Sequence, residues 1–317
     1  RQSCPDTPGQ QNKEPFLIPI RFGLLDEGGA DVVLNSNGDK ETLLELVSSS
    51  HEILIKDVPP NSVPSLLRGF SAPVKINYPY NAHQLAHLMR YDTDGFNRWD
   101  AGQQLSTKIL HELISDSRQG KPLKLDANFL DVLREILSDS SLDDAVAALM
   151  VTSPGEALLH ETADVVYPLA IHESRYFTQC AIAASLKTTL EQIYHRANTT
   201  ESYRPDSKQI GRRNLKNTAL RYLVLAGSGQ ELAWKQFREA DNMTDMASAL
   251  TALIVCPGGE EYAKLAIDQF EDRWREETLA MNLWFRIQSE NWRSRGLERV
   301  QKLMSHPLFS MKNPNKV

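Results

Sequence analysis

The chain has 317 residues, of which 41% are hydrophobic, and a formal net charge of −6 at pH 7. This length allows two domains with packed cores, and no apolar run approaches the length of a membrane span. The acidic balance argues against a nucleic-acid partner, which requires a basic face. The first residues lack the pattern of a signal peptide, and the chain begins as if cut from a longer one.

Cysteine usage indicates a reducing compartment. Cys4, Cys180 and Cys256 lie far apart and show no CxxC spacing. An odd, sparse set of this kind favours free thiols over a disulfide framework, so we expect a soluble protein of the cytoplasm or of an organelle. Cys180 lies in an apolar helical run, where it is expected to fill core space.

The first part of the chain reads as a β-domain. Residues 1–14 are rich in Pro, Gln, Asp and Gly and are expected to form a linker or domain lead-in. Over 15–79 short alternating runs between turns predict five or six strands of a small antiparallel sandwich. Pro19 should confine the first strand to a sheet edge or leave one of its sides unpaired. The expected strands include 16–25, 31–34, 42–47, 51–57 and 74–77.

Residues 63–80 form the joint of the chain, because Pro64, Pro73 and Pro79 interrupt regular backbone there. From residue 80 to residue 317 apolar residues recur with helical spacing, which predicts about a dozen helices. The simplest packing is a HEAT- or armadillo-like superhelix of stacked helix pairs, which we expect to be truncated at its C-terminal end.

Several of these helices have recognisable starts. Asn81 and Gln84 predict a capping box, and a long helix is expected from Pro168 to about residue 198. Other starts are expected at Asp94, Asp126 and Asp206. In the helix after Asp206, Ile210 and Leu215 are expected to face inward.

Two histidine motifs invite a metal interpretation that the sequence does not support. His83 and His87 have the i, i+4 spacing of a zinc helix, but Gln84 replaces the general base. Ser106 stands where a third ligand would fall, so two surface histidines on a capped helix are the better interpretation. The run from His160 to Asp164 begins like HExxH and ends in Asp164, so zinc is equally disfavoured there.

Other candidate chemistry is weaker still. The turns 69–73 and 227–229 lack the spacing of a nucleophile elbow or a phosphate loop. One helix carries a basic cluster of Lys208, Arg212, Arg213 and Lys216. Without interleaved aromatic residues, we interpret it as a solvated or ion-paired helix face.

Long, irregular motifs along nearly the whole chain resemble the landmarks of zinc aminopeptidases N (alanyl aminopeptidases) of the bacterial and organellar type, in the same order. They lie at 64–80, 96–101, 212–217, 240–245, 282–285 and 306–316. The resemblance implies an immunoglobulin-like spacer domain followed by a right-handed helical superhelix folded as a cap. It also implies polar contacts inside the superhelix at 212–217.

The resemblance further implies that zinc and catalysis belong to a thermolysin-like domain before residue 1, because this chain has no HExxH. In that domain zinc polarises the scissile carbonyl and a Glu acts as general base. We therefore expect no catalytic, cofactor-binding or metal residue here. The partners expected by resemblance are that missing catalytic domain and short peptide substrates, with no nucleic acid and no membrane.

The cap would restrict access to the active-site cavity, to which Asn315 and Lys316 are expected to lie close. Upstream in the reading frame we expect an HExxH followed about eighteen residues later by a Glu. The alternative is a stand-alone helical-repeat module that binds a protein partner. Such a module carries polar capping helices at its ends, whereas this chain stops just after a turn.

Overall fold

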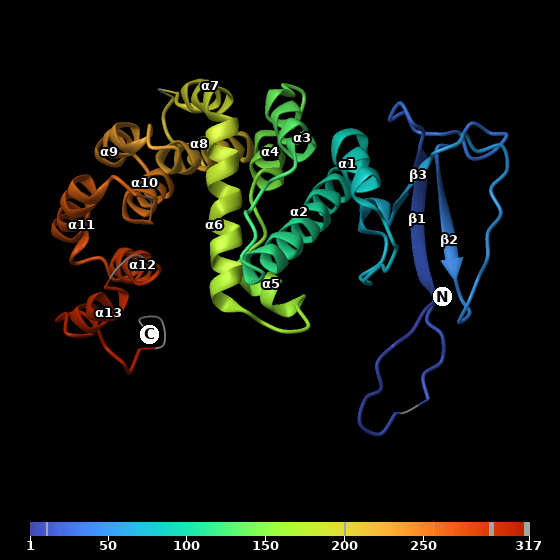
Figure 1. Cartoon of the computed structure of the whole chain (residues 1–317), viewed down its shortest axis with the longest axis horizontal. Helices are drawn as coiled ribbons and strands as arrows, with labels where there is room; N and C mark the ends of the chain where they lie inside the picture. The colour runs from blue at the N-terminus through green and yellow to red at the C-terminus, as the bar shows by residue number, and fades with distance from the viewer. Residues whose placement is uncertain (11, 200, 256, 292–294, 314–317) are drawn as a thin grey trace. The chain divides into compact units, whose positions relative to one another are not determined.

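The computed structural model describes residues 1–10, 12–199, 201–255, 257–291 and 295–313. The chain divides into two compact units, one of Arg1–Ile136 with Ser153–Ile171, and one of Leu137–Thr152 with His172–Val317. Among the described residues, three strands precede thirteen α-helices (Figure 1). In this same part of the chain, no helix combines the length and the apolar character of a membrane span.

The elements follow one another in this order. The strands are β1 (Ile18–Leu25), β2 (Glu41–Leu46) and β3 (Val63–Leu66), followed by the short 3-10 helix η1 (Arg68–Phe70). The helices are α1 (Ala82–Tyr91), α2 (Gly95–Arg118), α3 (Ala127–Ser138), α4 (Asp144–Met150), α5 (Glu156–Glu161), α6 (Pro168–Ser185), α7 (Lys187–Ala197), α8 (Ser207–Leu225), α9 (Gln230–Glu239), α10 (Met243–Val255), α11 (Glu260–Trp274), α12 (Thr278–Ser289) and α13 (Gly296–Met304).

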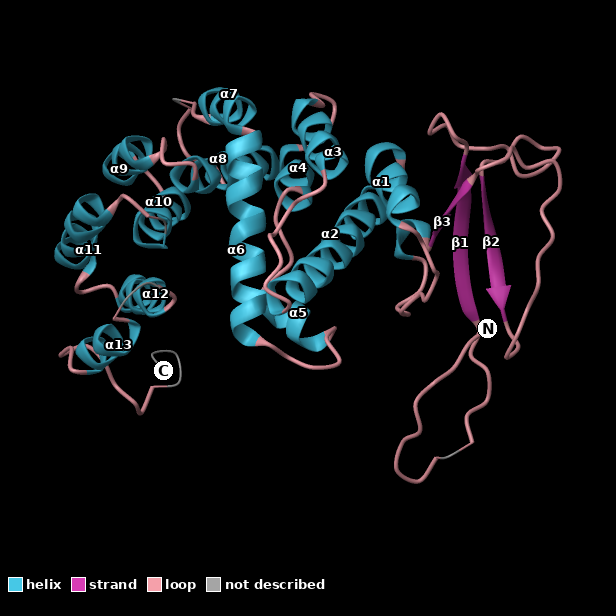
Figure 2. Ribbon diagram, in the orientation of Figure 1, coloured by secondary structure: helices cyan, strands magenta, loops and turns pink. Residues whose placement is uncertain are grey.

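The strands form one antiparallel sheet in the order β2-β1-β3 (Figure 2). β1 pairs with β2 from Ile18 to Gly23 and with β3 only from Phe22 to Leu25. Pro19 therefore lies where β1 has a neighbour on one side alone, as expected of a residue without a backbone donor. The end of β1 that pairs with β3 is buried, so the core of the sheet lies at that end.

The prediction of five or six strands was too high for the described residues. The runs 31–34, 51–57 and 74–77 form no strand, apart from a single bridge between Asp31 and Leu25. Alternation specifies a strand only where one face is buried, and Leu54 is 83% exposed. Asp57 also has a positive φ of 57°, which interrupts an extended run.

The expected helix starts are confirmed because each rests on a local hydrogen bond. Asn81 and Gln84 form the complete capping box of α1, and Asp94 accepts a hydrogen bond from the Asn97 backbone at the start of α2. Asp126 and Asp206 accept equivalent bonds from Asn128 and Gln209. Each cap satisfies a helix-terminal N–H that has no partner within the helix.

Within the helical part, one helix break and the burial of two residues differ from the predictions, because both depend on tertiary packing. The helix expected from Pro168 to residue 198 breaks at Leu186, where φ is −106° and ψ is 12°, giving α6 and α7. Leu186 itself is buried, with 1% exposed. The helix therefore breaks at a core residue, and no Gly or Pro is involved. Ile210, expected inward, is 44% exposed, and Cys180 is only half-buried.

The second unit stacks its helices in the manner of armadillo repeats. α8 packs against α4, α7 and α10, and the chain then continues through successive contacts of α9, α10, α11, α12 and α13. Gly211 allows α8 to approach α4 closely, because a Cβ there would lie 3.0 Å from the backbone nitrogen of Ala145 on α4. The expected fold class, a small immunoglobulin-like β-domain followed by an all-α superhelix, is therefore confirmed.

Within the first unit, a buried arginine joins the sheet to the first helices. Arg68 is 1% exposed. Its Nη2 lies 2.7 Å from Asp31 Oδ1 and 3.3 Å from Asp92 Oδ1, and its Nη1 lies 3.2 Å from Glu41 Oε1. Gly23 makes room for the guanidinium, since a Cβ at that position would lie 2.6 Å from Arg68 Nη1.

Neutral hydrogen bonds complete the same junction. The Asn97 side chain on α2 donates to Ser65 Oγ and to the Leu66 carbonyl, both at 2.8 Å. The ring of His87 on α1 lies 2.8 Å from the Asp26 carbonyl of the turn after β1. Side-chain hydrogen bonds from both α1 and α2 thus tie these helices to the segments next to the sheet.

In the junction, burial and charge pairing act on the pKa of each group in opposite directions. Burial lowers the pKa of Arg68, but its hydrogen bond to Asp31 and the charges of Asp92 and Asp31 raise it further, so the net shift is upward. Burial raises the pKa of Asp92, against the hydrogen bond from Ser65 and the charge of Arg68. A folded-state pKa above the unfolded value favours folding at low pH, and the effect is lost as pH rises through the folded-state pKa.

Replacing Arg68 with Met should therefore destabilise the chain by about 3–5 kcal/mol, because it leaves buried carboxylates without their cation. The deficit should be smaller at about pH 5 than at about pH 8, since protonated Asp92 needs no cationic partner. Urea unfolding at both pH values measures it. The control is Arg21→Met, which removes the exposed ion pair between Arg21 Nη1 and Glu41 Oε2, 4.0 Å apart. This change should cost less than about 1 kcal/mol. Equal losses in the two variants would contradict the prediction.

Candidate functional site

The histidine pair of α1 is not built as a metal site. His83 is exposed, whereas His87 is 7% exposed and contacts the Asp26 carbonyl. The interpretation as two surface histidines was therefore wrong for His87, which holds the sheet against α1. Within the described ranges, no group of three or more His, Cys, Asp and Glu side chains is placed to hold a metal ion.

The remaining sequence candidates do not come together either. Asn315 and Lys316 lie outside the described residues. His160 is on the short helix α5, with Nε2 buried. Gly227 has a positive φ of 77° just after α8 ends, so the expected turn at 227–229 is confirmed as a helix stop.

The basic face of α8 is ion-paired, as interpreted from the sequence, with only Lys208 left exposed. Arg212 Nη1 lies 2.8 Å from Glu201 Oε2. Arg213 donates to Gln209 Oε1 at 3.1 Å, and its guanidinium stacks over the Tyr203 ring at 4.8 Å. These contacts leave no continuous basic surface of the kind that nucleic acid requires.

Lys216, the fourth member of the cluster, forms a buried ion pair. Its Nζ lies 2.6 Å from Asp245 Oδ2, and their side chains are 8% and 7% exposed. Asp245 Oδ1 accepts a second bond from Asn217 Nδ2 at 2.8 Å. Asn242 caps α10 by accepting from the Asp245 backbone N–H at 2.9 Å. The polar contacts expected inside the superhelix at 212–217 are thus confirmed.

This network fixes the orientation of Gln236 on α9. The Asp245 carboxylate can only accept a hydrogen bond, so the Asn217 amide must turn its Nδ2 toward Asp245. Asn217 Oδ1 then faces Gln236. Gln236 Nε2 donates to that Oδ1 at 2.8 Å and to the Asp245 carbonyl at 3.0 Å. The amide nitrogen is therefore unambiguous, and Oε1 points the other way. Among the described residues, this buried Oε1 has no hydrogen-bond partner.

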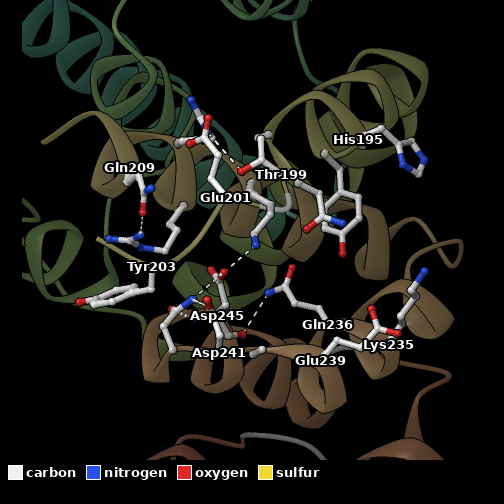
Figure 3. Close-up of a pocket in the computed structure, with 18 of the residues that line it drawn as sticks. His195, Thr199, Glu201, Tyr203, Gln209, Lys235, Gln236, Glu239, Asp241 and Asp245 are labelled. Atoms are coloured by element: carbon white, nitrogen blue, oxygen red, sulfur yellow. Dashed lines mark hydrogen bonds and ion pairs between the residues drawn. The ribbon is translucent and has the colours of Figure 1, made fainter. Parts of the chain in front are cut away.

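A cavity of about 390 Å³ lies above the network, between α7, α8, α9, α10 and the segment before α8 (Figure 3). Four cationic side chains line it: Arg212, Arg213, Lys216 and Lys235. Four anionic ones do the same: Glu201, Glu239, Asp241 and Asp245. Figure 3 shows the side chains of Gln236 and Asp245 in the same part of this lining. The cavity is polar and balanced in charge.

Tyr194 contributes a phenol to this cavity. Burial raises its pKa to about 12, and the negative charges of Asp245 and Glu239 act in the same direction. The hydroxyl therefore stays protonated at neutral pH and can act as a donor. The cavity offers charged groups of both signs, a phenol donor and an amide acceptor, which is a set suited to binding.

Sequence reasoning identified the basic residues of this site but missed Tyr194, Gln236 and Asp245 as its other side. The signal available was weak: polar residues such as Lys216 stand beside apolar core positions of the same helix. In the sequence, Asp245 stands out only as part of the landmark motif at 240–245, and Gln236 only as one residue of the helical part of the chain. Their convergence depends on contacts between residues about 20–30 positions apart.

Comparisons with known proteins assign the family. Residues 1–79 match the model described as "Domain of unknown function (DUF3458) Ig-like fold". Residues 82–317 match "Domain of unknown function (DUF3458_C) ARM repeats". The full chain is 34% identical to the aminopeptidase N of Escherichia coli, covering 36% of that protein. The chain belongs to the aminopeptidase N family. It corresponds to the C-terminal part of such a protein.

Two further relatives agree with this assignment. Aminopeptidase N of Haemophilus influenzae is 31% identical over the whole chain, which covers 36% of that protein. A crystal structure of Legionella pneumophila aminopeptidase A in complex with aspartic acid matches with a TM-score of 0.80 and 34% identity, over 95% of this chain and 35% of that one. The chain thus spans about a third of the length of the aminopeptidases that it matches.

Replacing Lys216 with Met should destabilise the chain by about 3–5 kcal/mol, since it leaves the Asp245 charge buried without a cation. Denaturant unfolding measures the loss. The matched control is Lys187→Met, which removes the exposed ion pair between Lys187 Nζ and Glu191 Oε1, 3.9 Å apart. This change should cost about 0.3–0.5 kcal/mol. The double variant Lys216→Met, Asp245→Asn should recover part of the loss. A loss at Lys216 no larger than that at Lys187 would show that the pair is not a structural centre.

Proposed function

We propose that this chain is the non-catalytic C-terminal part of a zinc-dependent aminopeptidase N that releases N-terminal amino acids from peptides. The observation that carries the proposal is the agreement of the whole chain, at 34% identity, with about a third of an aminopeptidase N. The remaining length of such a relative accommodates a separate catalytic domain, which would precede this part and supply the chemistry.

The described residues do not fit a catalytic zinc ion. Such a site needs three protein ligands and one open position. His87, the only histidine of the α1 pair that is buried, is already committed to the Asp26 carbonyl. No third ligand accompanies the pair in the described ranges. We therefore assign no step of peptide hydrolysis to this chain.

For the helical region we propose the role of a cap that encloses the active-site cavity and limits access to short peptides or unfolded ends. Stacked helix repeats suit this role, because successive repeats create an extended concave surface. The alternative of a stand-alone interaction module has less support, since the relatives that match the β-domain and the helices together are aminopeptidases.

The 317-residue chain alone, supplied with zinc, should hydrolyse neither alanine p-nitroanilide nor aspartate p-nitroanilide above the buffer rate. Both substrates are needed because the relatives carry the names aminopeptidase N and aminopeptidase A. Release of p-nitroaniline, followed by its absorbance, measures the rate. The positive control is the full-length polypeptide from the same reading frame, which should turn over at least one of the two. Zinc-dependent turnover by the chain alone would overturn the proposal that a separate domain performs the catalysis.

The cap should make the full-length enzyme discriminate by substrate size. A dipeptide and a folded protein with the same accessible N-terminal residue should differ in kcat/KM by at least about a hundredfold, because a closed chamber excludes the folded substrate. The same protein, unfolded by reduction and alkylation, is the matched control and should be cleaved. Similar kcat/KM values for the folded and unfolded forms would argue against a cap.

A further inference from the structure

We propose that the cavity between α7, α8, α9 and α10 binds a free α-amino acid in its zwitterionic form. This binding function does not rest on the proposed peptidase role of the parent protein, because every residue that carries it belongs to this chain. An amino acid is also what the proposed activity would release, so occupancy of the cavity would rise with the concentration of the reaction product.

The first argument is the unpartnered acceptor of Gln236. The side chain is 6% exposed, and two hydrogen bonds from its Nε2 fix its orientation. Its Oε1 is buried without a donor among the described residues, and Gln236 is one of the residues that line the cavity. A buried acceptor in this state costs free energy until a donor reaches it. An ammonium group carries three donors and would satisfy it.

The second argument is the charge balance of the lining. The Arg212–Glu201 and Lys216–Asp245 pairs are matched within the lining. The remaining charges are also of both signs, and a zwitterion can place each end against its opposite sign. Lys235 and Glu239 stand one turn apart on α9, and neither forms an ion pair with another described side chain. They are therefore available to the carboxylate and the ammonium group respectively, while Lys216 stays committed to Asp245.

The third argument is size and hydrogen-bond capacity. The cavity volume of about 390 Å³ lies at the small end of the range for ligand pockets, roughly 300–1,000 Å³. It suits an amino acid better than a long peptide. Tyr194 stays protonated at neutral pH because burial raises its pKa, and it adds a neutral donor for the carboxylate. Gln236, Tyr194, Lys235 and Glu239 together provide partners for both ends of the ligand.

Isothermal titration calorimetry of the 317-residue chain with L-leucine, L-aspartate, L-lysine and glycine tests the proposal. We expect saturable binding of at least one of them. N-acetyl-leucine lacks the ammonium group and leucinamide lacks the carboxylate, so each should bind at least about tenfold more weakly than leucine, as expected when one charge-assisted contact is lost. The assay needs no peptidase activity, so its outcome is independent of the proposed function.

Variants locate the binding. Lys235→Gln should weaken amino-acid binding about tenfold without lowering the unfolding midpoint, because Lys235 is exposed. Glu239→Gln, on the same helix, should act similarly through the ammonium end. Lys264→Gln on α11 is the matched control, since Lys264 is an exposed lysine outside the cavity lining, and it should leave binding unchanged. Gln236→Leu should abolish binding, but it also removes two internal hydrogen bonds, so the exposed variants decide.

Three results would overturn the proposal. The first is the absence of saturable binding of any tested amino acid, which would assign the cavity to solvent. The second is equal affinity for leucine and its two blocked analogues, which would exclude recognition of a zwitterion. The third is binding that Lys235→Gln and Glu239→Gln leave unchanged, which would locate the ligand elsewhere on the chain.

Discussion

The burial of Arg68 is the constraint on which the N-terminal unit depends. A guanidinium that is 1% exposed is tolerable only with carboxylates around it. These come from three separate places: Asp31 after β1, Glu41 on β2 and Asp92 after α1. One charge therefore requires the sheet and the first helices to be folded together. This explains why the compact unit extends to Ile136, although the change from alternating to helical sequence pattern occurs near residue 80.

The helical unit repeats this principle with Lys216 and Asp245. In each unit one buried cation connects elements that are distant in the chain, and neutral amides complete the network around it. Such networks are costly when incomplete, so they specify one arrangement of the helices rather than simply adding stability. Apolar contacts between stacked helices are more permissive. The relative placement of α8, α9 and α10, and hence the form of the cavity, follows from the polar contacts.

The sequence predicted what short-range physics determines. The caps at Asn81, Asp94 and Asp206 were correct because a capping side chain and its backbone donor lie three residues apart. Strands such as 51–57 were overpredicted, since alternation does not reveal whether a face will be covered. The burial of His87 and the break at Leu186 also depend on neighbours far along the chain. The ion-paired face of α8 was anticipated, whereas its partner Asp245 required the fold.

The cavity illustrates how a stack of helices can also acquire a defined binding chemistry. A leucine at position 236 would avoid the buried acceptor, but it would remove the hydrogen bonds that Gln236 Nε2 donates to Asn217 Oδ1 and to the Asp245 carbonyl. Gln236 therefore satisfies the network with its nitrogen, and its oxygen is held in place as a consequence. An acceptor fixed in this way loses little conformational entropy when a donor arrives. The same contacts that stabilise the helix stack thus preorganise the site, and binding and stability at Gln236 are two consequences of a single amide.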